Sequence, residues 1–322
     1  MTEPRRIRLQ RSELAVPATS PRFFAKAAAS AADVIFLDLE DAVAPARKVE
    51  ARAQAIAALN DIDWGAKTMA VRVNGLDTPW AHHDILELAQ HAPRLDLILL
   101  PKAGSAFDVQ FVAQLLTLVE RQTGRTKRTG IEVLIETAKG VANVEEIAQA
   151  SERLEAMIFG VGDYTVEMRT YDEVFGTPSA RYAVLTHGEA GGRERHWNDQ
   201  WHFAMARIAN ACRAYGLRPI DGPFTDFRDA DGYRASAGRA AALGFEGKWA
   251  IHPSQVELAN AAFSPTPQQL AWAARITAVM EATTRAGQGA VGADGVLVDM
   301  AHLKMADALV QRQALIENTT RR

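Results

Sequence analysis

Short apolar segments alternate with amphipathic segments along most of this chain, and this rhythm restricts the possible folds more than any other feature. A strand inside a parallel sheet reads as an unbroken apolar run, because helices cover both of its faces. Strict alternation of strand and helix predicts right-handed βαβ units and a parallel sheet. The predicted strands are 13–17, 34–38, 68–73, 97–101, 132–136, 156–160, 218–221 and 248–252. Eight strands favour an α/β fold of the closed (β/α)8 TIM-barrel type over an open doubly wound sheet.

The chain continues after the barrel pattern is complete. We therefore predict a TIM-barrel catalytic domain over 1–262 and a C-terminal helical extension over 263–322. The extension reads as a helix (266–285), a Gly-rich segment (287–295) and a final helix from about Met300. It is too short for an ordinary domain, so we expect it to pack on its own barrel or on a neighbouring subunit.

The composition excludes several classes of protein. The 36 basic residues against 39 acidic ones, a net charge of −3, leave no surplus to neutralise a nucleic-acid backbone. No apolar stretch approaches membrane-spanning length, and residues 1–14 lack the apolar core of a secretory signal, so we expect a cytoplasmic enzyme. The single cysteine, Cys212, excludes an internal disulfide and lies in a helical pattern typical of a buried thiol. The connection 164–194 is polar without a clear period, and a loop this long is usually functional or mobile.

Charged residues follow five of the apolar runs, and α/β barrels place catalysis at the carboxyl ends of their strands. Glu136 and Asp163 each come directly after such a run. A pair of oxygen ligands that leaves other positions to water and substrate is the pattern Mg²⁺ prefers, with Mn²⁺ as the alternative metal. The competing interpretation is that each residue caps the following helix, which suits Asp163 better than Glu136.

Three acidic residues, Asp38, Glu40 and Asp41, crowd negative charge at the end of the second predicted strand. They are consistent with a shell around metal-bound water and with a solvated helix entry, and both interpretations stay open. Arg72 is flanked by valines in the next strand, where a buried arginine would have no structural reason to replace an apolar residue. A guanidinium can fork onto a carboxylate or stabilise a developing oxyanion, and either interpretation places Arg72 in the site.

The remaining candidates suit substrate or cofactor contacts. Lys102 ends a strand, where a charge partner in the acidic site is preferred over a Schiff base. The spacing of Arg22 and Lys26 predicts one helix face suited to phosphates, although two solvated cations are the ordinary reading. His252 ends the last strand and is placed near the substrate. Asp299 precedes a helix that it would cap well.

Taken together, these segments resemble the citrate lyase β-subunit-like acyl-CoA lyases of the HpcH/HpaI aldolase superfamily. The matching segments run in the family's order and cover most of the chain: RSELAVPATSPRFFAKA, FLDLEDAVAP, VRVNGLDT, LILLPK, LIETAKG, FGVGDY and GKWAIHPSQ. Two further segments, RPIDGPFTDF and DQWHFAMAR, are most similar to those of malyl-CoA lyases. The resemblance implies a TIM barrel with a C-terminal extension, assembled as a homotrimer or hexamer.

The resemblance also implies roles for four acidic residues of the site and for its arginine. Glu136 and Asp163 match the two carboxylates that bind Mg²⁺ in the family. Glu40 and Asp41 match an acidic pair that supports metal-bound water, and Arg72 matches the arginine that polarises the thioester carbonyl.

Further positions extend the match to coenzyme A and to the proton-transfer group. Arg22 and Lys26 match residues that contact the coenzyme A phosphates, and Asp299 matches an acid/base donated across a subunit interface. The implied reaction is Mg²⁺-dependent, reversible cleavage of L-malyl-CoA, or β-methylmalyl-CoA, to glyoxylate and acetyl-CoA, or propionyl-CoA. In malyl-CoA lyases the segment that corresponds to 164–194 is rich in small residues and carries a Gly-Gly pair. Segment 164–194 of this chain departs from that pattern. A malyl-CoA thioesterase, a citramalyl-CoA lyase and an acyl-carrier-dependent citrate lyase β subunit therefore stay open as alternatives.

Overall fold

Eight parallel strands close into a barrel, which confirms the predicted fold class. The computed structural model describes residues 7–171, 173–188, 191–293 and 295–320. Around the barrel the strand order is β1-β10-β9-β6-β5-β4-β3-β2, so barrel strands that follow one another along the chain are also neighbours in the barrel. After β6 the chain forms a further two-stranded sheet before it returns to the barrel. The barrel strands are β1 (Ser12–Pro17), β2 (Val34–Asp38), β3 (Thr68–Arg72), β4 (Leu97–Leu100), β5 (Gly130–Ile135), β6 (Leu154–Phe159), β9 (Arg218–Asp221) and β10 (Gly247–Ala250).

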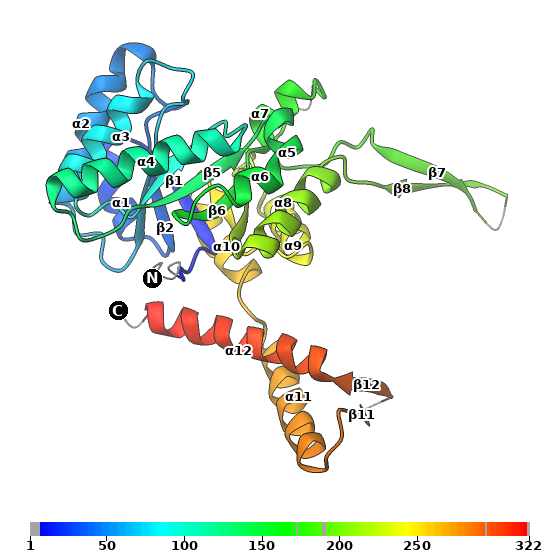
Figure 1. The fold of residues 1–322 in the computed structure, drawn as a ribbon. Coiled ribbons are helices and arrows are strands. Elements are labelled where there is room, and N and C mark those ends of the chain that lie inside the picture. Colours follow the sequence, from blue (N-terminus) through cyan, green and yellow to red (C-terminus); the bar gives the residue numbers. More distant parts are fainter. Residues whose placement is uncertain (1–6, 172, 189–190, 294, 321–322) are drawn as a thin grey trace. The chain divides into compact units, whose positions relative to one another are not determined.

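Helices lie between successive strands and cover the outside of the barrel (Figure 1). The longer ones are α2 (Lys48–Asp61), α3 (Ala81–His91), α4 (Ala106–Thr123), α8 (His202–Tyr215) and α9 (Ala230–Ala242). The shorter ones are α1 (Phe24–Ala28), α5 (Ala138–Ala142), α6 (Val144–Ala148), α7 (Val161–Glu167), α10 (Val256–Ala262) and the 3-10 turns η1 (Pro21–Phe23), η2 (Pro45–Arg47) and η3 (Pro253–Gln255). Among the described residues, no helix is both long and apolar enough to cross a membrane.

Alternate residues of each strand fill the barrel interior, because successive side chains in a strand point to opposite faces. On β2 the inward residues Val34 and Phe36 belong to one buried cluster, and Asp38 follows at the same spacing. On β3 Ala70 is in the cluster and Arg72 comes two residues later. The period that packs the core therefore also directs these charged groups into the carboxyl-terminal end of the barrel, which we call the mouth.

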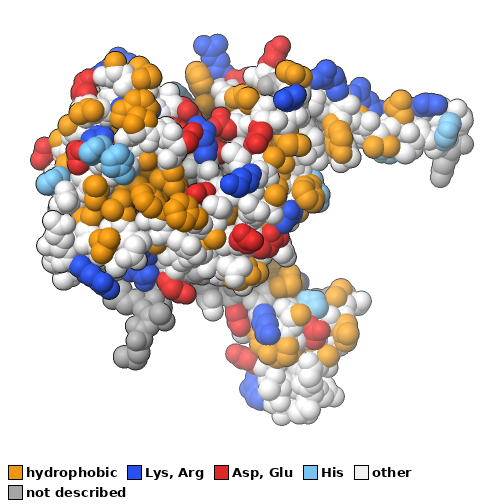
Figure 2. Space-filling model, turned by 45° about the horizontal axis from the view of Figure 1, so that its top comes forward, with side chains coloured by type: hydrophobic (Ala, Val, Ile, Leu, Met, Phe, Trp, Pro, Cys, Tyr) orange, Lys and Arg blue, Asp and Glu red, His pale blue; other side chains and the backbone are white. Residues whose placement is uncertain are grey.

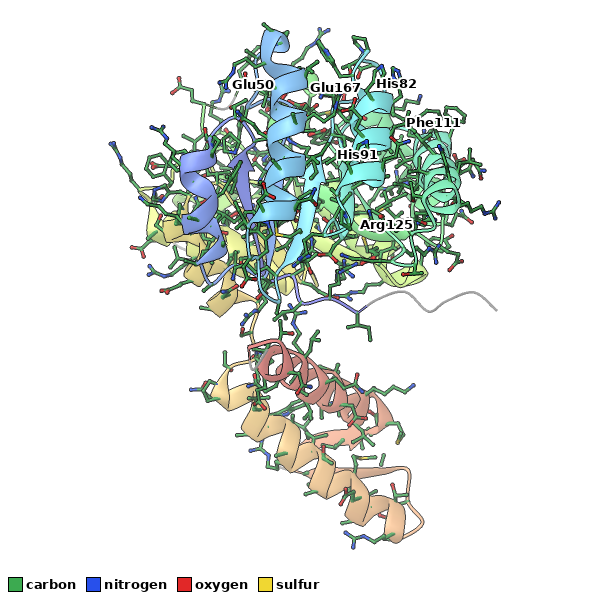
Figure 3. All side chains as sticks on the ribbon, turned by 90° about the vertical axis from the view of Figure 1, so that its left-hand side faces the viewer. Glu50, His82, His91, Phe111, Arg125 and Glu167 are labelled. Atoms are coloured by element: carbon green, nitrogen blue, oxygen red, sulfur yellow. The ribbon has the colours of Figure 1, made fainter. Side chains whose placement is uncertain are left out.

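Helix α4 shows how one face of a barrel helix is buried. Ser105 and Asp108 form a capping box at its start, which satisfies backbone N–H groups that the first turn leaves free. Two of its aromatic side chains lie on the surface, with Phe107 66% and Phe111 38% exposed. Figure 3 shows Phe111 at the outer surface of the barrel unit. The helix buries a different set, Val109, Val112, Leu116, Val119 and Glu120.

The long connection after α7 is not irregular throughout, contrary to the expectation from its polar sequence. It contains an antiparallel hairpin of β7 (Ala183–His187) and β8 (Arg193–Trp197). The hairpin extends away from the barrel in Figure 1, and most of β7 is exposed. Because neither face of this ribbon is buried against the core, its strands carry no apolar alternation that a sequence pattern could reveal.

Residues Phe263–Arg322 form a second compact unit, separate from Met1–Ala262. It contains α11 (Pro267–Arg285), an antiparallel pair of β11 (Ala290–Ala293) and β12 (Val296–Asp299), and α12 (Met300–Thr320). A small apolar core holds it together, made of Ala273, Ile276, Met280, Val298 and Ala306. The predicted Gly-rich segment thus contains strand β11, which pairs with the following strand β12.

Candidate active site

Arg72 is the centre of a charge network at the barrel mouth. It ends β3 and is 8% exposed, with its guanidinium bound by both oxygens of Asp38 on the neighbouring strand β2. Nε and Nη2 donate to the Asp38 carboxylate at 2.7 and 2.6 Å, the two-pronged geometry that arginine favours. Nη1 lies 3.0 Å from Glu40 and 3.3 Å from Asp41. The acidic cluster and Arg72 therefore do meet, as the sequence predicts.

An aromatic floor lies beneath this guanidinium. Its central carbon is 5.6 Å from the ring centre of Trp249 and 6.0 Å from that of Phe36. The two rings pack at 4.5 Å from each other. Trp249 follows the same inward spacing on β10 as Phe36 does on β2, so both are extensions of the barrel core. They hold Arg72 from below while the carboxylates hold it from the side.

Lys102 connects the acidic cluster to the predicted metal carboxylates. Its ammonium lies 2.9 Å from Glu40 and 3.5 Å from Asp163, and its backbone N–H donates to Glu136 at 2.7 Å. The residue has a φ of +53°, a left-handed conformation that is strained for a side chain with a Cβ. Burial on its own would lower the pKa of Lys102, but the hydrogen bond to Glu40 and the negative charge of Glu40 raise this pKa above its ordinary value. An amine held as an ammonium suits a charge partner, the preferred prediction, rather than a Schiff base.

Glu136 lies one residue beyond β5 and is 4% exposed, whereas the Asp163 side chain, in the first turn of α7, is 40% exposed. Burial, together with the nearby charges of Glu40 and Asp163, raises the pKa of Glu136 to about 8. Gly160 leaves the space that Glu136 occupies, because a Cβ there would lie 2.6 Å from its Oε2 atom. The chain thus concentrates carboxylate oxygen without enough cations of its own to neutralise it.

These residues fit a divalent cation that is bound partly by water and substrate. Within the described part of the chain, no group of three or more His, Cys, Asp or Glu side chains could hold a metal by itself. Two carboxylates with other positions left open are the arrangement typical of Mg²⁺. The buried Oε2 of Glu40 has no hydrogen-bond partner, since its contact with Arg72 has ion-pair distance without hydrogen-bond geometry. A buried oxygen of this kind suits a site that also takes water or an ion.

A cavity of about 510 Å³ opens among these groups, within the size range of small-molecule sites. Its polar lining comes from Asp38, Asp41, Arg72, Glu136, Asp163 and Thr225. The rest of its lining is largely apolar and includes Ala15, Pro17, Phe36, Leu134, Val166, Phe175, Pro223, Trp249 and Ile251. Figure 2 shows acidic and basic side chains interleaved on the surface of the barrel unit.

The other barrel-unit candidates lie near the strand ends but outside the network. Arg22 lies in η1 and Lys26 in α1, so the single helix face predicted for them is divided between two elements. Both are exposed. His252 is exposed as well, where it caps η3 and stacks on Phe227 at 4.9 Å, while its neighbour Ile251 lines the cavity. Their roles in substrate or coenzyme A binding stay predictions.

Asp299 belongs to the second unit and ends β12. Its Oδ1 atom accepts hydrogen bonds from the backbone N–H groups of Ala301 and His302 and lies 2.8 Å from the His302 ring. The hydrogen bond with His302, followed by those from the backbone, lowers the pKa of Asp299. Within its own unit this residue is a helix cap, as the alternative interpretation stated, and its role as an acid/base stays a prediction.

Sequence reasoning overlooked Lys48, which shapes the acidic loop from below. Its buried ammonium donates to the carbonyl oxygens of Leu39 and Glu40 at 2.8 and 2.7 Å. Burial lowers its pKa, while the charge of Asp38 opposes this. Lys48 begins α2, and nothing in its local pattern distinguishes it from a solvated helix lysine.

With this geometry established, comparison with known proteins places the chain in a family. The family model for HpcH/HpaI aldolase/citrate lyase matches residues 11–253, so the chain belongs to that family, as predicted. Among curated relatives, an L-malyl-CoA/beta-methylmalyl-CoA lyase of Cereibacter sphaeroides is 48% identical over 96% of both chains. A protein with the same name from Rhodobacter capsulatus is 47% identical over the same shares. A (3S)-malyl-CoA thioesterase of Cereibacter sphaeroides is 35% identical over 92% of each chain.

Solved structures give the same family. CitE from Mycobacterium tuberculosis, in complex with magnesium, acetoacetate and coenzyme A, has a TM-score of 0.72 and 31% identity, covering 95% of this chain and 98% of that one. A citrate lyase from Burkholderia xenovorans LB400 has a TM-score of 0.80 with 21% identity, covering 98% and 94%, and supports the fold alone.

Proposed function

We propose that this chain is a carbon–carbon lyase that acts on an acyl-CoA, cleaving L-malyl-CoA or β-methylmalyl-CoA reversibly to glyoxylate and acetyl-CoA or propionyl-CoA. The observation that carries the proposal is the position of Arg72 beside two metal-type carboxylates, Glu136 and Asp163, in one cavity. The similarity to relatives named as lyases of these two substrates, at 47–48% identity over most of the chain, supports the same reaction.

Glu136 and Asp163 would hold Mg²⁺, with Mn²⁺ as the alternative, and the bound ion would orient and polarise the carboxylate and hydroxyl oxygens of the substrate. The hydroxyl oxygen becomes the carbonyl of glyoxylate, and its proton passes to solvent. The electron pair of the broken C–C bond becomes an enolate of the thioester. Arg72 stabilises the charge on the enolate oxygen, and its fixed position on Asp38 means that little reorganisation is needed during the reaction.

The other residues act before and after bond cleavage. Glu40 and Asp41 keep Arg72 in place and would support water bound to the metal. Arg22 and Lys26 bind the phosphates of coenzyme A, and Lys102 and His252 contact the substrate. Asp299, contributed by the second unit of a neighbouring chain in a homotrimer or hexamer, protonates the enolate carbon and removes a methyl proton in the condensing direction.

The test is an assay with two channels on purified protein, Mg²⁺ and (S)-malyl-CoA. One channel traps glyoxylate with phenylhydrazine and the other detects free coenzyme A thiol. Glyoxylate without thiol is the expected result, and removing the metal with a chelator should abolish it. Glyoxylate release that is unaffected by chelation would refute the role given to Glu136 and Asp163.

A second candidate function is hydrolysis of the thioester, which the 35% identical (3S)-malyl-CoA thioesterase favours. In that reaction water attacks the thioester carbonyl, so thiol appears and glyoxylate does not. A third, an acyl-carrier-dependent citrate lyase β subunit, is favoured by the solved citrate lyase β subunit that is 30% identical. It predicts silence in both channels with (S)-malyl-CoA, because its substrate is a thioester of a carrier subunit rather than of coenzyme A.

A further inference from the structure

The segment that follows α7 forms a fixed wall of the cavity. Phe175 lines the cavity, and its backbone is tied to Thr225, which follows β9. Phe175 N–H donates to the Thr225 hydroxyl at 3.0 Å, and the Thr225 N–H donates back to the Phe175 carbonyl at 3.1 Å. The next residue, Gly176, has a φ of +91° and accepts a hydrogen bond from Ser236 of α9 at 3.1 Å. Two hydrogen bonds with Thr225 and one between Gly176 and α9 thus set the position of the Phe175 backbone.

The ring of Phe175 lies against the first turn of α7, which carries Asp163. A Cβ added at Gly162 would be 3.4 Å from this ring, and Gly162 directly precedes Asp163. Arg72, in contrast, ends β3, which β4 and β5 separate from the strand β6 that leads into α7. The ring therefore borders the part of the cavity formed by α7, rather than the part where Arg72 would meet the thioester.

We infer that Phe175 determines specificity by limiting the group carried by the hydroxyl-bearing carbon of the substrate. This inference rests on the proposed function, in which the oxygens on that carbon are held at Glu136 and Asp163. The carbon bears hydrogen in malyl-CoA, which releases glyoxylate, and a methyl group in citramalyl-CoA, which releases pyruvate. We expect a methyl group on that carbon to meet the Phe175 ring, so the site would favour a 2-oxo acid without an alkyl group.

The test compares kcat/KM for (S)-malyl-CoA and for citramalyl-CoA in the wild type and in Phe175→Ala. Excluding or admitting one methyl group in an apolar pocket changes discrimination by about 10- to 200-fold. We expect the wild type to prefer malyl-CoA, and the variant to shift the ratio at least about 10-fold toward citramalyl-CoA. An unchanged ratio in an active variant, or a wild type that prefers citramalyl-CoA, would overturn the inference.

Further variants separate the wall from general damage. Thr225→Val removes the hydroxyl that accepts from Phe175 and should shift the ratio in the same direction by a smaller factor, whereas Thr225→Ser should restore it. These two carry the test if Phe175→Ala does not fold. Phe203→Ala removes a ring that is 65% exposed on α8, outside the cavity, and should leave the ratio unchanged.

The failure of this inference is distinguishable from the failure of the proposed function. Release of glyoxylate by the wild type with no change of ratio in the variants refutes the role of Phe175 alone. Absence of cleavage with both substrates refutes the proposed function, and with it the inference that depends on it.

Discussion

The two ends of the barrel both carry dense charge, yet they are built differently. At the mouth, Arg72 and its carboxylates line an open cavity, and the carboxylates outnumber the cations. At the amino-terminal end, which we call the base, most of the charges are buried in a network of ion pairs, and the side chains of its two most exposed members are 28% and 29% exposed. Its acidic members are Glu13, Asp96, Glu132 and Glu155, and its basic members are Arg8, Arg94, Lys127 and Arg218.

The base network has a neutral centre, Gln10. Its amide nitrogen donates to Glu13 at 3.0 Å and to Glu132 at 2.8 Å, and its amide oxygen accepts from Arg218 at 2.8 Å. Arg218 also lies 3.3 Å from Glu155. Here the acids and bases are equal in number, as a buried site requires, whereas the excess acid at the mouth calls for a cation from outside. We therefore expect charge at the base to stabilise the fold and charge at the mouth to serve the proposed reaction.

The largest effect on catalysis is expected from Asp299, the proposed acid/base group of the second unit. Asp299→Ala should lower turnover by about 100- to 10,000-fold, because it removes that proposed group. It should also abolish deuterium exchange at the methyl group of acetyl-CoA, measured by NMR, while metal affinity measured by calorimetry stays unchanged. Persisting exchange would refute the assignment.

The same variant tests whether the residue comes from a neighbouring subunit. A mixture of inactive Asp299→Ala and inactive Arg72→Ala chains, unfolded and reassembled together, should regain part of the activity. Each variant reassembled alone is the control. No recovery in the mixture, with both variants assembled normally, would mean that Asp299 acts within its own chain or not at all.

Arg72→Ala is expected to reduce turnover by about 100- to 1,000-fold, the effect of removing one group that stabilises an oxyanion. The KM should change much less, because Arg72 interacts most strongly with the charge of the transition state. Steady-state kinetics in the glyoxylate channel measure both quantities. Near-normal turnover would show that the mouth uses another group on the thioester oxygen.

The sequence predicts the mouth well because its signals are local. Each strand is an apolar run, and Asp38, Arg72 and Glu136 follow such runs at the inward spacing. The closed barrel is predictable for the same reason, since parallel strands buried on both faces appear in the sequence as unbroken apolar runs. The family resemblance supplied the roles that pattern alone left open.

The parts that escaped prediction depend on contacts between distant residues. Gln10 and Glu132 are 122 residues apart, and both lie inside or beside predicted strands where a buried polar residue looks like an interruption. Phe175 reaches the cavity only through its pairing with Thr225, 50 residues away. The hairpin β7–β8 is exposed on both faces, so no apolar period marks it. Local sequence holds no signal for any of these arrangements.

The base should respond to substitution in stability rather than in catalysis. Arg218→Met leaves Glu132 and Glu155 with less compensation and should lower the free energy of unfolding by about 3–5 kcal/mol, measured by urea denaturation. Arg234→Met, which removes an exposed ion pair with Asp231, is the matched control and should cost at most about 1 kcal/mol. If Arg218→Met instead raised the KM without destabilising the fold, the division between base and mouth would be wrong.

The smallest effect concerns the pH dependence of stability. Burial, and then the charge of Glu132, raise the pKa of Glu13 well above its ordinary value, against the hydrogen bond from Gln10. A carboxyl whose pKa is raised by folding binds more protons in the folded state. Its contribution to the unfolding free energy is therefore complete at a pH below its pKa in the unfolded chain, and is lost as the pH rises from there through its pKa in the folded protein. Glu13→Gln should therefore make the unfolding free energy of the protein fall less steeply between about pH 5 and pH 8.

A surface carboxylate of opposite behaviour provides the control for this slope. The hydrogen bond from Arg47 lowers the pKa of the exposed Glu50, so its small contribution is present at neutral pH and lost on acidification. Glu50→Gln should leave the slope between about pH 5 and pH 8 unchanged, because both states of the wild type are already ionised there. If Glu13→Gln also keeps the wild-type slope, Glu13 is ionised in the folded protein. Burial at the base would then fail to raise the pKa of Glu13, and the contribution assigned to this carboxyl in the pH dependence of stability would be wrong.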